Sequence, residues 1–154
     1  MSFVIVAGIS GSLPARMTKS GTQPMPEDDE WGQITGWVAD TEGYPGSVVV
    51  GTKKEGLKAL SEQKSATVTA AIAYTGATKG RGAATKLQAR LRVNSTIVAT
   101  SQPPMDGPAG TLSVSATVDI AVGDVVTVEA LSVPVSGGEA GTVSANTGTF
   151  VQIT

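Results

Sequence analysis

The longest regular pattern in this chain is a strict alternation of apolar and polar residues over Thr111–Ile120. Successive side chains of a β-strand point to opposite faces, so this pattern predicts a strand with one buried and one exposed face. Such half-buried strands are typical of antiparallel sheets. The residues expected to point inward are Leu112, Val114, Ala116, Val118 and Ile120.

Other segments alternate in the same way, or are short apolar runs between turn residues. Lys53–Gln63 leans toward a helix, but Gly56 interrupts it, so we interpret it as a loop or one turn. Gln102–Gly110 and Val133–Thr142 are rich in Gly or Pro and are interpreted as loops. No strand–helix–strand alternation appears, so the chain is predicted to be all-β, an antiparallel β-sandwich or jelly roll. The predicted strands are Phe3–Ala7, Gln33–Ala39, Ser47–Gly51, Ala66–Thr75, Thr85–Val93, Thr96–Thr100, Val125–Leu131 and Gly148–Thr154.

Residues 1–30 are interpreted as an extended N-terminal arm. Gly and Pro residues interrupt Gly8–Glu30 repeatedly, and this segment closes with the acidic run Glu27–Glu30. An arm of this kind buries little surface alone, so we expect it to become ordered against a partner. Residues 31–154 then form the predicted jelly-roll domain.

Composition narrows the chemistry that this chain can perform. It has no Cys and no His, which excludes disulfides, the common zinc sites and histidine-based acid–base or triad catalysis. Ser–Lys, carboxylate and all-oxygen metal chemistries stay formally open, but no convincing spacing supports them. The net charge of -2 gives no electrostatic attraction to nucleic acid. We therefore predict a non-enzymatic protein with no catalytic residues, cofactor, metal or nucleic-acid partner.

The N-terminal residues Met1–Gly8 are apolar but lack a basic region before the apolar run. They therefore do not resemble a secretory signal, and no apolar run approaches the length of a membrane span. We expect synthesis in a cytoplasm, no membrane insertion, and a final location set by assembly.

Two segments of the arm carry candidate binding functions. Val4–Ser12 looks like a strand leading into a phosphate-binding loop, but that chemistry needs a helix directly afterwards, and Pro14 and Gly21 follow instead. We favour an extended arm. The carboxylates of Glu27–Glu30 could bind a cation, although a solvated run or a contact with a basic partner is favoured.

Charged residues of the predicted domain suggest two further sites. Asp119 and Asp124 flank a turn and could pair or bind Ca²⁺; we favour Asp124 as a turn cap and Asp119 as an outward strand residue. A basic stripe could touch polyanionic glycan, nucleic acid or the acidic arm of a neighbouring subunit. No aromatic residue interleaves it, and we favour a solvated strand face. The stripe consists of Lys79, Arg81, Lys86, Arg90 and Arg92.

Trp31, Trp37 and Tyr44 cluster in sequence near Pro45-Gly46. Exposed, they would form a sugar-binding platform or a protein anchor. Because the chain has few aromatic residues, we favour burial at the lid of the barrel.

The segment Val118–Val128, followed after a loop by Gly148–Ile153, resembles the end of complement globular-head and tumour-necrosis-factor-like jelly rolls. The shared features are an apolar strand, the Gly123-Asp124 turn, a Val-rich strand and a last strand carrying a Phe. The resemblance implies that Phe150 fills the core as a large plug, and that the chain forms a homotrimer.

The whole chain also resembles small virion proteins of tailed phages, especially those infecting actinobacteria. The shared features are a short N-terminal arm, a Gly-Trp strand at Gly36–Ala39, the turn Tyr44–Gly46 and a Thr/Ala/Val-rich jelly roll. This resemblance implies a structural virion component, a minor tail or fibre protein, that docks on other virion proteins through residues 1–30. The alternatives are a capsid (head) decoration protein and a glycan-binding module for host recognition, with the loops Gln102–Gly110 and Gly137–Gly141 contacting host surface glycan.

Overall fold

A computed structural model describes the chain except for residues 1–10, 28–29 and 103. The described residues form fourteen β-strands and no helix. The strands are β1 (Ala15–Lys19), β2 (Gln23–Pro24), β3 (Gly32–Gln33), β4 (Trp37–Ala39), β5 (Val49–Val50), β6 (Gly56–Lys58), β7 (Gln63–Ala77), β8 (Lys86–Val93), β9 (Thr96–Thr100), β10 (Met105–Asp106), β11 (Gly110–Ile120), β12 (Val125–Val133), β13 (Ala140–Val143) and β14 (Asn146–Ile153).

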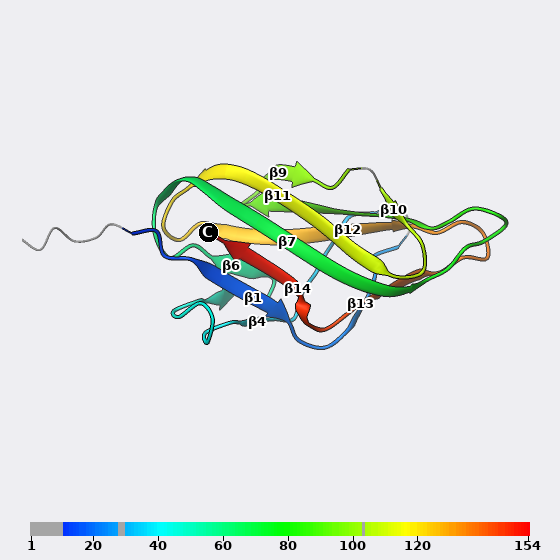
Figure 1. The fold of residues 1–154 in the computed structure, drawn as a ribbon, viewed down its shortest axis with the longest axis horizontal. Coiled ribbons are helices and arrows are strands. Elements are labelled where there is room, and N and C mark those ends of the chain that lie inside the picture. Colours follow the sequence, from blue (N-terminus) through cyan, green and yellow to red (C-terminus); the bar gives the residue numbers. More distant parts are fainter. Residues whose placement is uncertain (1–10, 28–29, 103) are drawn as a thin grey trace, which may run out of the picture.

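The strands form two antiparallel sheets that pack face to face as a jelly-roll sandwich. In sheet A, β7 is the longest strand and pairs with β11 on one side and with β14 and β13 on the other. β14 also pairs with β1, and β1 pairs with β4. β13 also pairs with β2. In sheet B, β12 lies between β8 and β6, while β5, β9 and β10 occupy the borders and β3 pairs with β12. Figure 1 shows the elongated molecule. The all-β sandwich predicted from the alternating pattern is confirmed.

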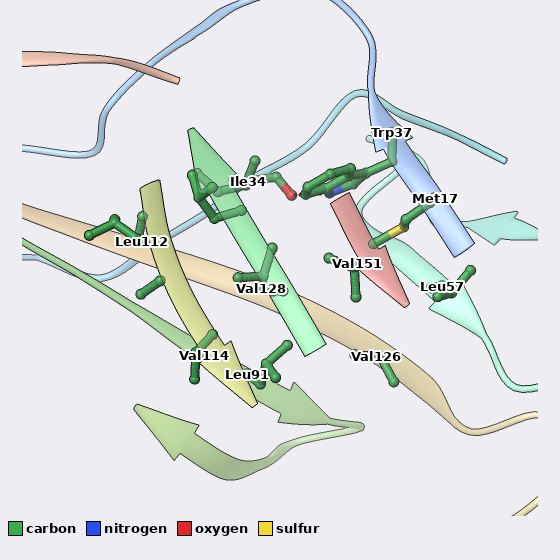
Figure 2. Close-up of a cluster of buried hydrophobic side chains, with 14 of the residues drawn as sticks. Met17, Ile34, Trp37, Leu57, Leu91, Leu112, Val114, Val126, Val128 and Val151 are labelled. Carbon is green, nitrogen blue, oxygen red and sulfur yellow. Dashed lines mark hydrogen bonds between the residues drawn. The ribbon is translucent and has the colours of Figure 1, made fainter. Parts of the chain in front are cut away.

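The core lies between the two sheets and is mostly aliphatic. In β7 the alternating residues Val68, Ala70, Ile72 and Tyr74 point inward and are all at most 1% exposed. Figure 2 shows part of this cluster, which contains residues of sheet A, such as Met17 and Val151, and residues of sheet B, such as Val126 and Val128. The alternation in Thr111–Ile120 also holds, except that Ala116 and Val118 are only half-buried.

The predicted arm boundary at residue 30 is wrong for the part of the arm that the structure describes. Ala15–Lys19 forms β1, an interior strand of sheet A between β14 and β4. Ala15 and Met17 alternate inward, and the expected Gly and Pro breaks at Pro14 and Gly21 only bound this strand. The predicted Phe3–Ala7 strand lies outside the described residues.

The described residues between 20 and 36 then cross from sheet A to sheet B. Met25 and Ile34 are buried at 1% and 0% exposure at the two ends of this crossing. The backbone N–H of Met25 bonds Gly141 O, and that of Ile34 bonds Val128 O, both at 3.0 Å. This segment therefore covers the core, and it is not an independent arm.

Three segments that were predicted as loops contain short strands. β6 lies within Lys53–Gln63 because buried Leu57 pairs with Val126 of β12. β13 begins within the predicted loop Val133–Thr142 and ends at Val143, and β10 lies in Gln102–Gly110. These strands are too short for a periodic pattern, and their pairing partners stabilise them.

The predicted strand Gln33–Ala39 is two strands, β3 in sheet B and β4 in sheet A. Gly36, whose φ of +70° is easily adopted only by glycine, lies at the break between them.

Candidate interaction surface

The outer face of sheet A is a broad surface whose side chains are mostly small and uncharged. It is built from the outward residues of five neighbouring strands, in the order β4, β1, β14, β7 and β11. Because the strand register aligns these residues in rows, they form one continuous face. We call this the sheet A face; it comprises Val38, Arg16, Thr18, Phe150, Gln152, Thr67, Thr69, Ala71, Ala73, Thr75, Thr111, Ser113, Ser115 and Thr117.

Phe150 lies on the sheet A face and not in the core, so its predicted role as a core plug is wrong. Its neighbours in β14, Thr149 and Val151, are fully buried, whereas Phe150 is half-buried on the opposite side. The register places Phe150 between Thr18 of β1 and Ala71 of β7.

Arg16 holds the ring of Phe150 in place from the neighbouring strand. Its Cζ lies 4.1 Å from the centroid of the Phe150 ring and 5.7 Å from that of Tyr44. Arg16 Nε lies 3.8 Å from a carboxylate oxygen of Asp40, and Nη2 donates to Thr147 O at 3.3 Å. Tyr44 in turn donates from its hydroxyl to Gln152 Oε1 at 3.3 Å. These contacts limit the motion of the aromatic side chains before any partner binds.

The sheet A face has almost no charge. Arg16 is the one ionisable residue among its members, and Asp40 accompanies it. At one end of the face, Lys64 and Asp119 form an exposed pair at 3.4 Å. Toward the β11 border of the face, Thr69 and Ser115 hydrogen-bond each other at 3.0 Å between their hydroxyls.

The outer face of sheet B differs, because charged groups cover it. Glu129 accepts hydrogen bonds from Nε of both Arg90 and Arg92, at 2.9 Å for Arg92. Trp31 lies over Arg90, with the guanidinium carbon 4.3 Å from the ring centroid. Lys86 pairs with Asp106 at 3.0 Å. Thus the favoured view of the basic stripe as a solvated face is only partly right, since carboxylates and an aromatic ring neutralise and cover most of it.

Burial raises the pKa of Glu129, but the hydrogen bonds and charges of Arg90 and Arg92 lower it more, so the net pKa is below its ordinary value. The carboxylate therefore stays ionised at neutral pH and holds the two guanidinium groups together. The outer face of sheet B is an internally paired surface.

The two aspartates singled out in the sequence act locally. Asp124 Oδ2 accepts the N–H of Ala121 at 2.9 Å and Oδ1 accepts from Asn94 Nδ2 at 3.0 Å, so it caps its turn as predicted. Asp119 points outward and accepts the N–H of Ser65 at 2.9 Å. These backbone bonds are the main reason that the pKa of each carboxyl group is lowered.

The three clustered aromatic residues have three different environments. Trp37 is fully buried and donates from Nε1 to Ile34 O at 2.8 Å, which confirms its predicted burial. Trp31 is half-buried on sheet B over Arg90, and Tyr44 is half-buried beside the sheet A face. The predicted common lid is therefore wrong, because the sandwich separates these residues onto two sheets.

Of the arm candidates, Val4–Ser12 lies outside the described residues except for Gly11 and Ser12, and Glu27–Glu30 is described only at its two ends. Within the part of the chain that the structure describes, no three Asp or Glu side chains come together as metal ligands would. In the same part, no helix has the length and apolar character of a membrane span.

Sequence reasoning missed the sheet A face as a unit. Arg16 and Thr18 were assigned to the arm, and Phe150 to the core. The available signal was the alternation of Ala15, Arg16, Met17 and Thr18, which is too short to stand out between Pro14 and Gly21.

Comparison with known proteins identifies the fold but no family. No protein-family model matches the chain, and no curated protein matches its sequence. Among solved structures, Eiger TNF from S. frugiperda superposes with a TM-score of 0.60 at 14% sequence identity, over 92% of this chain and 90% of that chain. The fold is therefore a tumour-necrosis-factor-like jelly roll, as the segments around Gly123-Asp124 and Phe150 suggested.

Proposed function

We propose that this protein is a non-enzymatic structural module that self-associates as a homotrimer through the sheet A face. The observation that carries the proposal is a face five strands wide on which Arg16 is the one ionisable member, with that arginine packed on the aromatic ring of Phe150 at its centre. Protein interfaces are depleted in charged residues at their core and enriched in aromatic residues and Arg. Phe150, Tyr44 and Arg16 have this composition, while the surrounding Thr, Ser and Ala residues allow close approach.

The contrast between the two outer faces supports the choice of surface. The sheet B face carries Arg90, Arg92 and Glu129, whose charges would lose hydration if another copy covered them. Covering the sheet A face would cost far less hydration, because its side chains carry few charges and the hydroxyls of Thr69 and Ser115 already bond each other. A homotrimer also agrees with the sequence resemblance to complement-head and tumour-necrosis-factor-like domains.

Replacing Phe150 with Asp is expected to convert the oligomer to a monomer. The substitution places a charge at the centre of the contact and removes its largest apolar side chain. A central interface residue of this kind contributes about 2 kcal/mol or more, which corresponds to a dissociation constant raised at least about 30-fold. Sedimentation velocity at micromolar concentration measures this as a shift from a species of three 15.5 kDa chains to a single chain.

The control for this experiment is Gln33→Asp, which adds the same charge at an exposed position on sheet B. Ser113→Arg, two strands away from Phe150 on the sheet A face, tests the same contact with a different residue. Circular dichroism monitors folding of every variant. A wild-type protein that sediments as a monomer, or a Phe150→Asp variant that keeps the wild-type oligomer, would refute the proposal.

The proposed biological setting is a phage virion. This part rests on the sequence resemblance carried by Gly36–Ala39 and Tyr44–Gly46, and it assigns the chain to a minor tail or fibre component, with a head decoration protein as the alternative. Because β1 belongs to the sandwich, the docking segment in this proposal shrinks from residues 1–30 to the residues before Ala15.

Deleting residues 1–10 is expected to abolish incorporation into particles and to leave the fold and oligomer intact. The comparison is made by quantifying the protein in purified particles after complementation with the wild-type or the shortened chain. Immunogold labelling of wild-type particles then locates the protein on the tail or the head. Undiminished incorporation of the shortened chain would contradict docking through this segment. If the full-length protein is absent from wild-type particles, the virion setting is contradicted.

A further inference from the structure

A small apolar cavity lies among the loops at one end of the sandwich. Its volume is about 260 Å³, and three loop segments line it. Ala77, at the end of β7, lines this cavity. A different hollow lies at the start of β7, where Gln63 and Ala66 line it together with Ser12 and the C-terminal Thr154. Because β7 runs along the length of the molecule (Figure 1), the cavity and the C-terminus lie toward opposite ends. The cavity is lined by Ala77, Thr78, Lys79, Ala84, Thr85, Gly107 and Pro108.

Hydrogen bonds within the protein hold the walls of this cavity. Gly80 and Ala83 close the β7–β8 hairpin with two backbone bonds of 3.0 and 2.8 Å. The buried hydroxyl of Thr85 lies 2.9 Å from Thr78 O and 3.1 Å from Glu139 O, which links this hairpin to the β12–β13 loop. The N–H of Ala77 bonds Pro108 O at 3.1 Å. The cavity is thus formed before a ligand binds, and these wall groups already have partners.

The one charged residue that lines the cavity, Lys79, is positive. Lys79 lines the cavity and Arg81 lies two residues away on the same hairpin; within the described parts of the chain, neither forms a salt bridge. Asp106, adjacent to the wall residue Gly107, is already paired with Lys86 at 3.0 Å. Glu139 lines a separate hollow beside Gly138 and Gly141.

We propose that this cavity binds a hydrophobic carboxylate, with the apolar group inside and the carboxylate beside the ammonium of Lys79. A cavity of about 150 Å³ accommodates benzene, so this one has room for a single ring or a branched aliphatic group. The alkyl stem of a lysine can line an apolar wall while its charged end stays in water. The wall contains no aromatic side chain, which disfavours stacking of a sugar ring.

This binding site is independent of the proposed self-association. None of its lining residues belongs to the sheet A face, so Phe150→Asp should leave binding unchanged. The loops Gln102–Gly110 and Gly137–Gly141 were singled out in the sequence as candidate recognition loops. The first supplies Gly107 and Pro108 to the cavity.

The test is an amide chemical-shift titration of the full chain with phenylacetate and with phenylacetamide, which has the same ring but no charge. Phenylacetate should shift the amides of Thr78, Lys79, Ala84 and Thr85 and reach saturation at millimolar concentration. Phenylacetamide should bind about fivefold more weakly, the usual contribution of a partly exposed ion pair.

Two variants separate the cavity from the charge. Lys79→Met keeps an apolar stem, so it should reduce phenylacetate affinity to that of phenylacetamide and leave phenylacetamide unchanged. Ala84→Leu should fill the cavity and weaken both ligands, while the spectrum confirms that the protein is folded. Shifts that do not saturate, shifts at other residues, or equal phenylacetate affinity in Lys79→Met would overturn the proposal.

A second arm distinguishes a free small molecule from the end of a partner chain, which present the same chemistry. The probe is the peptide acetyl-Gly-Gly-Phe with a free C-terminal carboxylate. Tighter binding than phenylacetate assigns the site to a chain terminus, whereas weaker binding assigns it to a small molecule. Saturable binding of neither probe counts against the site.

Discussion

Trp37→Ala is expected to lower the free energy of unfolding by about 3–5 kcal/mol, the usual cost of truncating a fully buried large aromatic residue. Trp37 is 0% exposed, and Figure 2 shows it beside Ile34 and near Met17 and Val151. The substitution would also leave Ile34 O without the indole donor. Because domains of this size are stable by about 5–15 kcal/mol, the loss is a large fraction of the total.

Urea denaturation followed by circular dichroism measures this loss as a shift of the midpoint. Phe150→Asp is expected to give a monomer under the proposed self-association, so these measurements are best made in that background, where folding is a single-chain reaction. Trp37→Phe keeps much of the packing but removes the hydrogen bond, and should therefore cost clearly less than Trp37→Ala.

Trp31→Ala is the matched control, since it removes the same side chain from the surface of sheet B. Trp31 covers Arg90 and is half-buried, so its loss is expected to cost about 1 kcal/mol. Equal losses for Trp31 and Trp37 would contradict the described burial of the two residues.

Glu129→Gln is expected to destabilise the protein by about 1–3 kcal/mol at pH 7. The side chain of Glu129 is 12% exposed and lies between Arg90 and Arg92, which are 16% and 26% exposed. Removing the carboxylate leaves two neighbouring cations without their counter-ion. Breaking a fully buried pair costs about 3–5 kcal/mol, and the partial exposure of the guanidinium groups reduces that amount.

The pH dependence of stability provides a second measure of Glu129. Its pKa is lowered in the folded state, so the folded protein holds this proton less tightly than the unfolded chain does. The resulting stabilisation is present above the unfolded pKa of about 4.3 and is lost as the pH falls through the lower, folded pKa. The stability difference between wild type and Glu129→Gln should therefore be constant from pH 7 to about 5 and shrink below that.

Asp119→Asn is the comparison for this experiment. The pKa of Asp119 is also lowered, chiefly by the Ser65 N–H, but its side chain is exposed and its partner Lys64 is exposed as well. The variant should lose little stability at pH 7. A Glu129→Gln variant as stable as wild type at pH 7 would contradict the role of Glu129 as the shared counter-ion.

Long alternating segments were predictable from the sequence because each has enough residues to define a buried face. Thr111–Ile120 and Ala66–Thr75 became β11 and β7, the longest pair in sheet A. The turn at Gly123-Asp124 was also predictable, because Asp124 bonds the backbone of its own turn. These features depend on residues that are close in sequence.

The short strands and the candidate surface were not predictable in this way. β1 has five residues between Pro14 and Gly21, and it is ordered by pairing with β14, more than a hundred residues later. The pattern cannot show which face of β14 is covered, so Phe150 was assigned to the core. The core already contains Trp37 and Tyr74 among its aliphatic residues, and the register leaves Phe150 on the opposite face beside Arg16.

The sequence by itself determined the all-β class, the two-faced central strands and the lack of histidine and cysteine chemistry. Periodicity and composition are properties of the chain alone, so no tertiary contact was needed to read them. The tertiary structure alone decided that residues 15–24 belong to the sandwich, that Glu129 neutralises the basic stripe, and that Arg16, Tyr44 and Phe150 meet on one open face. Each of these depends on strand pairing between residues far apart in sequence, and the register of such pairing is selected by the packed core as a whole.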